Sequence, residues 1–226
     1  MKKNTVDLLK RYAVATLGLI LIAFGVALSL KSNLGTAPIS CPPAMFNLRW
    51  TRISVGTFTW LMHLVLILFQ MVLMGRNFKP AFLMQIPAAL VFGYLCDAAI
   101  WACSGLTVTT YLGRILLCLA TVVVTAAGLR LEIIASAWMI AGDMTILVLS
   151  KVTRLRVSSV KILFDVFMVL LAAVFAWICF GRPDGDGVSA IVREGTLILA
   201  LLTGPCMRLT DPLIDRLFPR LAQKNG

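Results

Sequence analysis

Long apolar runs separated by short polar or basic segments dominate the chain. Six of them have the length of a membrane span, about 18 or more residues with almost no charge. These runs are Tyr12–Leu30, Ile53–Met74, Ala81–Cys103, Tyr111–Leu129, Ile162–Phe180 and Val188–Pro205. Continuous runs of this kind predict helices, not the short alternating segments of a transmembrane barrel. We therefore expect an all-α fold, a polytopic helical membrane protein with six transmembrane spans.

Two further apolar segments are interrupted. Leu34–Pro43 contains three prolines and a glycine, which a regular helix does not accommodate because each proline removes a backbone donor and clashes with the preceding turn. Ile134–Asp143 lies at the corresponding place about 100 residues later. If both segments enter the membrane and return, the chain has six crossings. If both cross, it has eight.

An internal repeat accounts for the spacing of these two segments. Shifting the chain by roughly 100 residues places Ala27–Lys31 on Ala127–Leu131, and other short matches follow in the same order. The pattern predicts a first pseudo-repeat over residues 12–105 and a second over 111–205. Six crossings make the repeats antiparallel, and eight make them parallel. Paired interrupted helices in two such halves are typical of transporters.

The composition excludes a soluble protein and leaves one integral membrane domain over residues 1–226. Hydrophobic residues make up 60% of the chain and charged residues only 14%, whereas soluble domains carry about 25% charge. The net charge of +11 sits in short loops and at the ends, which fits the positive-inside rule and not a nucleic-acid partner. Both termini are predicted to be cytoplasmic, in a bacterial inner membrane. Residues 206–226 form a basic amphipathic tail expected on the cytoplasmic surface.

Several short motifs carry a resemblance to a known family. They are Lys31–Pro38 after the first span, Ile53–Thr57 opening the second, Gly142-Asp143, Arg193–Thr196 and Gly204-Pro205. With these motifs the chain resembles the YitT/YczE family of bacterial integral membrane proteins over about residues 12–205. The family has an aspartate shortly after the position of Pro38, where this chain has Ser40 and Cys41, and a proline that the second motif lacks. The resemblance implies a membrane protein of this architecture and brings no substrate.

Charged groups within the spans are the first functional candidates, because a charge in the bilayer costs at least about 2.5 kcal/mol unless it faces protein or water. Asp143, beside Gly142 in the second interrupted segment, is predicted to belong to a solute, ion or proton site. The alternative is an aspartate that caps a short helix. Asp97 is a weaker candidate that also fits the membrane surface. Asp165 follows Lys161 by four residues, which predicts a helical ion pair.

Polar groups at membrane depth are the second candidates. His63, the only histidine, is placed to relay protons or to hydrogen-bond a neighbouring helix. It shares one helical face, predicted to point into the bundle, with Gly56, Thr59 and Gln70. Gly35, Thr36, Pro38 and Ser40 are predicted to present open backbone groups to a ligand. The alternative is a plain loop outside the membrane.

These features favour a transporter or permease for a small solute of unknown identity. The alternative is a non-transporting accessory or regulatory protein that acts through a partner at its basic cytoplasmic face. We do not expect an enzyme, because no nucleophile set, Walker motif or carboxylate cluster is present. We expect no cofactor and no metal site. The lipid bilayer is the predicted partner, and a homo-oligomer is compatible with the same sequence.

Overall fold

The computed structural model describes residues 2–78, 80–135, 140–186 and 189–218, and in this part of the chain the protein is all-α. Its helices are α1 (Lys2–Ser32), η1 (Pro38–Ser40), α2 (Cys41–Arg49), α3 (Val55–Met74), η2 (Gly75–Asn77), η3 (Pro80–Met84), α4 (Gln85–Ala102), α5 (Tyr111–Ala135), α6 (Ala141–Thr153), α7 (Val157–Phe180) and α8 (Glu194–Leu217). The described residues contain no strand, only one isolated bridge in the loop between α7 and α8. The predicted fold class is confirmed.

Six helices are long and apolar enough to span a membrane. The candidate spans are Leu9–Ser32, Val55–Asn77, Phe82–Ala102, Tyr111–Ala135, Val157–Phe180 and Glu194–Leu217. By contrast, α2 has 9 residues and α6 has 13. A crossing needs about 20 residues, so α2 and α6 are too short. The structure therefore supports six crossings with two short helices inserted between them.

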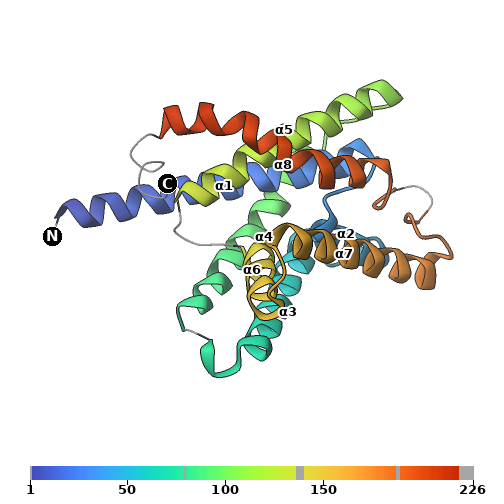
Figure 1. The fold of residues 1–226 in the computed structure, drawn as a ribbon. Helices are drawn as coiled ribbons and strands as arrows, with labels where there is room; N and C mark the ends of the chain where they lie inside the picture. The colour runs from blue at the N-terminus through green and yellow to red at the C-terminus, as the bar shows by residue number, and fades with distance from the viewer. Residues whose placement is uncertain (1, 79, 136–139, 187–188, 219–226) are drawn as a thin grey trace.

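The directions of α1 and α5 distinguish the two repeat models. The start of α1 packs on the end of α5, where Val14 clusters with Leu131. Past the end of α1, Leu34 clusters with Cys118 near the start of α5. The two helices are thus antiparallel, as Figure 1 shows with α8 alongside them. Because α1 and α5 are the first helices of the two halves, this direction fits inverted repeats and not parallel ones.

Close approach of backbones brings α1 and α5 together. A Cβ atom on Gly18 would lie 2.8 Å from the carbonyl oxygen of Gly128, and a Cβ on Gly128 would lie 2.8 Å from that of Gly18. Small residues at helix crossings allow this contact in membrane proteins. Further along α1, Gly25 meets Thr125, its own counterpart at the 100-residue shift. Equivalent residues touch each other at a two-fold axis, so this contact fits the proposed alignment. The repeat boundaries themselves stay a prediction.

The other contacts repeat between the halves, with one exception. In the described residues α1 packs on α4 as α5 packs on α8, and α2 packs on α7 as α6 packs on α3. However, α4 also packs closely on α3, where Gly93 lies against Gly56. At Gly204 of α8, the counterpart of Gly93, an added Cβ would meet no described atom within 4 Å. The two halves therefore differ in how their last helix is held.

The last helix differs from the predicted span. It begins at Glu194, not Val188, and continues to Leu217 through Pro205, where the span was expected to end. Proline is tolerated inside membrane helices because neighbouring groups satisfy the freed carbonyl. The continuation is held by Arg130 of α5, whose guanidinium forms ion pairs with Asp211 at 3.1 Å and Asp215 at 2.7 Å. The position of the tail on the membrane surface stays a prediction.

Candidate functional site

The two interrupted segments meet at the centre of the fold. Ile39 in η1, which leads directly into α2, lies against Gly142 in the first turn of α6. A Cβ on Gly142 would collide with the Ile39 side chain. Both short helices therefore begin at this contact. Residues 136–139 of the second interrupted segment lie outside the described residues.

A buried amide cluster fixes the start of α6. The Gln70 amide of α3 donates hydrogen bonds to the Ala141 carbonyl at 3.0 Å and to Thr145 Oγ1 at 2.9 Å. It also exchanges hydrogen bonds with the Gln85 amide of α4 at 3.1 and 3.3 Å. All of these side chains are buried. The cluster ties α6 to α3 and α4, and since its amides are paired with each other it serves to position the site.

The inward face predicted for the second span is confirmed. Gly56, Thr59, His63 and Gln70 are all buried. His63 is 1% exposed, its Nδ1 lies 2.8 Å from the Thr59 carbonyl oxygen, and Nε2 has no hydrogen-bond partner among the described residues. Its ring meets Phe92 edge-on at 5.8 Å. Phe92 belongs to the same core cluster as Ile140, the residue that precedes α6.

Asp143 lies half-buried in the first turn of α6, and a buried acid, Glu132, is bonded to the N-cap residue of the same helix. Glu132, near the end of α5, is 3% exposed, and its Oε1 accepts a hydrogen bond from the Ile140 backbone N–H at 2.7 Å. Because Ile140 is the N-cap of α6 and Asp143 is the third residue of that helix, both acids belong to the same helix start. The predicted Lys161–Asp165 ion pair is confirmed at 3.0 Å.

Sequence reasoning missed Glu132. Its signal was an acidic residue between the fourth span and the second interrupted segment, eleven positions before Asp143. There Glu132 reads as part of the polar end of the fourth span, so nothing local singles the residue out. Only the fold brings the end of α5 to the start of α6.

The segment before α2 is closed, which corrects the expectation of open backbone groups there. The Thr36 N–H donates to the Ile191 carbonyl at 3.1 Å, and its hydroxyl lies 2.6 Å from that of Ser29. Gly35, at φ +107°, packs against Thr196. The Ser40 N–H donates back to the Ala37 carbonyl at 2.8 Å. The polar groups of Thr36 are thus bonded to the loop before α8 and to α1, and the N–H of Ser40 is bonded within the 3₁₀ turn.

Pro38 and Ser40 keep a place near the site, whereas Asp97 does not. Pro38 is buried at the start of η1, and Ser40 is the last residue of η1, directly before α2. Asp97 accepts hydrogen bonds from the Ser54 hydroxyl at 2.6 Å and from the Gly56 N–H at 2.7 Å. It therefore caps the start of α3, a structural role in which an acid at a helix N-terminus is favoured.

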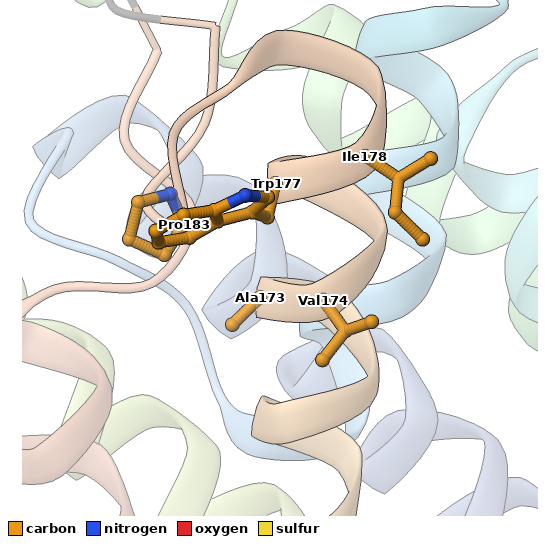
Figure 2. A pocket seen from close by; sticks show the side chains of 5 residues that line it. All are labelled: Ala173, Val174, Trp177, Ile178 and Pro183. Atoms are coloured by element: carbon orange, nitrogen blue, oxygen red, sulfur yellow. The ribbon is translucent and has the colours of Figure 1, made fainter.

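A shallow apolar hollow lies on the outer surface of α7. Figure 2 shows Ala173, Val174, Trp177 and Ile178 of α7 with Pro183 of the following loop, and Trp177 lies beside Pro183. Every lining residue is apolar. A hollow of this kind on an exposed helix fits lipid chains better than a polar solute. Among the described residues no group of three His, Cys, Asp or Glu side chains is placed to hold a metal ion.

Fold and site together define a multi-pass α-helical membrane protein with a buried polar centre at the meeting of two short helices. The chain belongs to a family of unknown function, DUF6198, whose sequence profile matches residues 9–212. No curated protein and no solved structure matches the chain. The resemblance to the YitT/YczE family stays a prediction.

Proposed function

We propose that this protein transports a small polar solute across the bacterial inner membrane and is not an enzyme. The observation that carries the proposal is the contact of Ile39 with Gly142, where two short helices begin side by side inside the bundle. Transporters with inverted repeats place their substrate sites at such discontinuous helices near the bilayer midplane. Irregular backbone at that depth is tolerated only where it meets protein or a water-filled path.

The proposed solute site lies at the start of α6. Gly142 lets a ligand approach the backbone, and Asp143 supplies a charge that would be costly at this depth without a task or a partner. Pro38 and Ser40 supply the opposite side through η1. His63 lies behind Phe92 and is a second polar group for the path. Gly35, Thr36 and Asp97 hold the surrounding helices.

Topology gives a prediction that needs no substrate. With both termini in the cytoplasm and six crossings, Asn77 in the turn between α3 and α4 faces the cytoplasm. We expect a cysteine placed at Asn77 to resist a membrane-impermeant maleimide in intact cells and to react after the inner membrane is opened. A cysteine at Gly105, between α4 and α5, is the matched control and should react in intact cells. Labelling of the residue-77 cysteine from outside would contradict the six-span arrangement.

Transport itself is tested with purified protein. A thermal-shift screen against amino acids, sugars, nucleosides and organic acids selects a binder, and uptake of that labelled compound into proteoliposomes then follows. We expect uptake by the wild-type protein and at least a tenfold loss for Asp143→Asn. If no compound is taken up above empty liposomes, the transporter proposal fails.

The second candidate function rests on the exposed basic loop after α6. Lys151, Arg154 and Arg156 are all exposed and lie where a partner could dock. Arg154 has φ +59°, so Arg154→Asn combined with Arg156→Gln removes the charges while keeping a residue that tolerates this conformation. An accessory protein would lose its cellular phenotype in this double variant and keep it in Asp143→Asn. A transporter gives the reverse result.

A further inference from the structure

One oxygen of a buried carboxylate is unused at the start of α6. Glu132 Oε1 holds the Ile140 N–H at 2.7 Å, whereas Oε2 has no hydrogen-bond partner among the described residues. The oxygen is buried within a residue that is 3% exposed. Leaving a buried acceptor unpaired costs about 1–3 kcal/mol, and more when it is charged. The carboxyl therefore has capacity to bind something at the helix start.

Asp143 brings a second acid into range of this carboxyl. Glu132 binds the N–H of Ile140, the N-cap of α6, and Asp143 is the third residue of that helix, so both carboxylates lie at one helix start. Two carboxylates at one site disfavour each other's charge. The start of α6 contributes only about half a positive charge, which does not balance two negative ones. Lys161 is already paired with Asp165 at 3.0 Å. The pair is thus short of positive charge.

In the described part of the chain, no lysine or arginine of the surrounding helices forms an ion pair with Glu132 or Asp143. On α5 itself, Arg130 is bound to Asp211 and Asp215 of α8. On α1, Lys10 is exposed and Arg11 is half-buried, one turn before Val14, which packs on the end of α5. α3 and α4 contribute His63 and the paired amides Gln70 and Gln85. Asp97 of α4 is committed to the start of α3.

We propose that Glu132 and Asp143 bind a monovalent cation, either a proton or an ion such as Na⁺, at the start of α6. The inference rests on the proposed function for its purpose, which is to couple solute movement to an ion gradient. The binding itself is measured without transport. The cation neutralises the two carboxylates at the start of α6, the helix that Gln70 holds against α3 and α4. Release of the cation therefore changes the charge at the point where the two short helices meet.

The test uses the purified full-length protein in detergent and two kinds of measurement. Thermal transitions are recorded from about pH 5 to about pH 9 in choline chloride, and then at fixed pH with NaCl, LiCl or KCl replacing choline at constant ionic strength. A ligand that binds the folded state raises its stability with concentration. Infrared spectra record the C=O stretch of protonated carboxyl groups over the same pH range. The variants are Glu132→Gln, Asp143→Asn and Glu132→Asp, with Glu194→Gln as matched control at an exposed ion pair.

A proton at the site predicts a wild-type stability that falls as the pH rises, because the folded state then holds a proton that it loses. The infrared C=O band of the protonated carboxyl group then disappears at high pH, and it is absent from the spectrum of Glu132→Gln or of Asp143→Asn. A metal ion predicts instead that one of the three salts raises the transition temperature over choline. In either case the response of Glu132→Gln and Asp143→Asn is at least halved, and that of Glu132→Asp and Glu194→Gln is kept.

Identical responses of wild type, Glu132→Gln and Asp143→Asn in both measurements would overturn the proposal. So would failure of both neutral variants to fold, because the proposal holds that the pair is neutralised in the folded protein and a neutral amide should substitute for it. Cation binding without any solute uptake would refute the transporter and leave this site. Uptake that is indifferent to Glu132→Gln would leave the transporter and refute the coupling of this site to transport.

Discussion

Replacing Gly128 by leucine should separate α1 from α5 and strongly lower the stability of the protein. A Cβ at this position would lie 2.8 Å from the Gly18 carbonyl oxygen and 3.0 Å from the Ile22 backbone nitrogen. Both obstacles are backbone atoms, so no side-chain rotation relieves them. Overpacking typically costs about 1–3 kcal/mol, and we expect the upper end, about 3 kcal/mol.

The measurement is the thermal transition and the monodisperse yield of the detergent-solubilised protein, and the control is Gly204→Leu. Both substitutions replace a helical glycine and gain about 1 kcal/mol of helix propensity. They differ in that a Cβ at Gly204 would meet no described atom within 4 Å. If the Gly128→Leu and Gly204→Leu variants have the same transition temperature, α1 and α5 do not touch as described.

The membrane spans were predictable because each depends on a local property. Length and hydropathy identify a helix that the bilayer can hold, and five of the six runs reappear with shifts of a few residues. The sixth failed at both ends for non-local reasons. Its start is displaced because the loop before α8 docks on the other half. The Ile191 carbonyl of that loop accepts a hydrogen bond from the Thr36 N–H at 3.1 Å, and the Gly195 N–H at the start of α8 donates to the Leu34 carbonyl at 2.8 Å. Its end is displaced because Arg130 holds Asp211 and Asp215 on a continued helix.

The candidate site was only half predictable for a related reason. Asp143 was identifiable because it follows a glycine in an interrupted apolar segment, which is a local pattern. Glu132 was not, because its place beside Asp143 depends on the end of α5 meeting the start of α6. Asp97 shows the converse case: a charge in a span made it a candidate, and in the fold it accepts hydrogen bonds at the start of α3. A charged residue in a membrane helix indicates that it has a partner, but that partner need not be a neighbour in the sequence.

The direction of the repeats was also beyond the sequence. The distribution of basic residues fits six and eight crossings equally well. What decides between them is the antiparallel packing of α1 and α5, in which Gly18 meets Gly128 and Gly25 meets Thr125. A periodicity of apolar residues indicates that a helix has a packing face. It does not indicate whether the partner helix packs there parallel or antiparallel.

The contact between the interrupted segments gives the second large effect, on function and not on folding. We expect Gly142→Leu to block binding and uptake of the solute, because the new side chain occupies the point where η1 and α6 meet. The obstacle here is the Cδ1 end of Ile39, a flexible side chain that can move aside. The loss of stability should therefore stay below that of Gly128→Leu.

A double variant tests whether this contact is the cause. Ile39→Ala removes the atoms that the leucine would strike, so Gly142→Leu combined with Ile39→Ala should recover stability relative to Gly142→Leu alone. Contacting residues show such non-additive free energies, typically of about 0.5–3 kcal/mol. The readouts are the thermal transition and the proteoliposome uptake of each single and double variant. Strictly additive effects would mean that the two interrupted segments do not meet, and the transporter proposal would lose the observation that carries it.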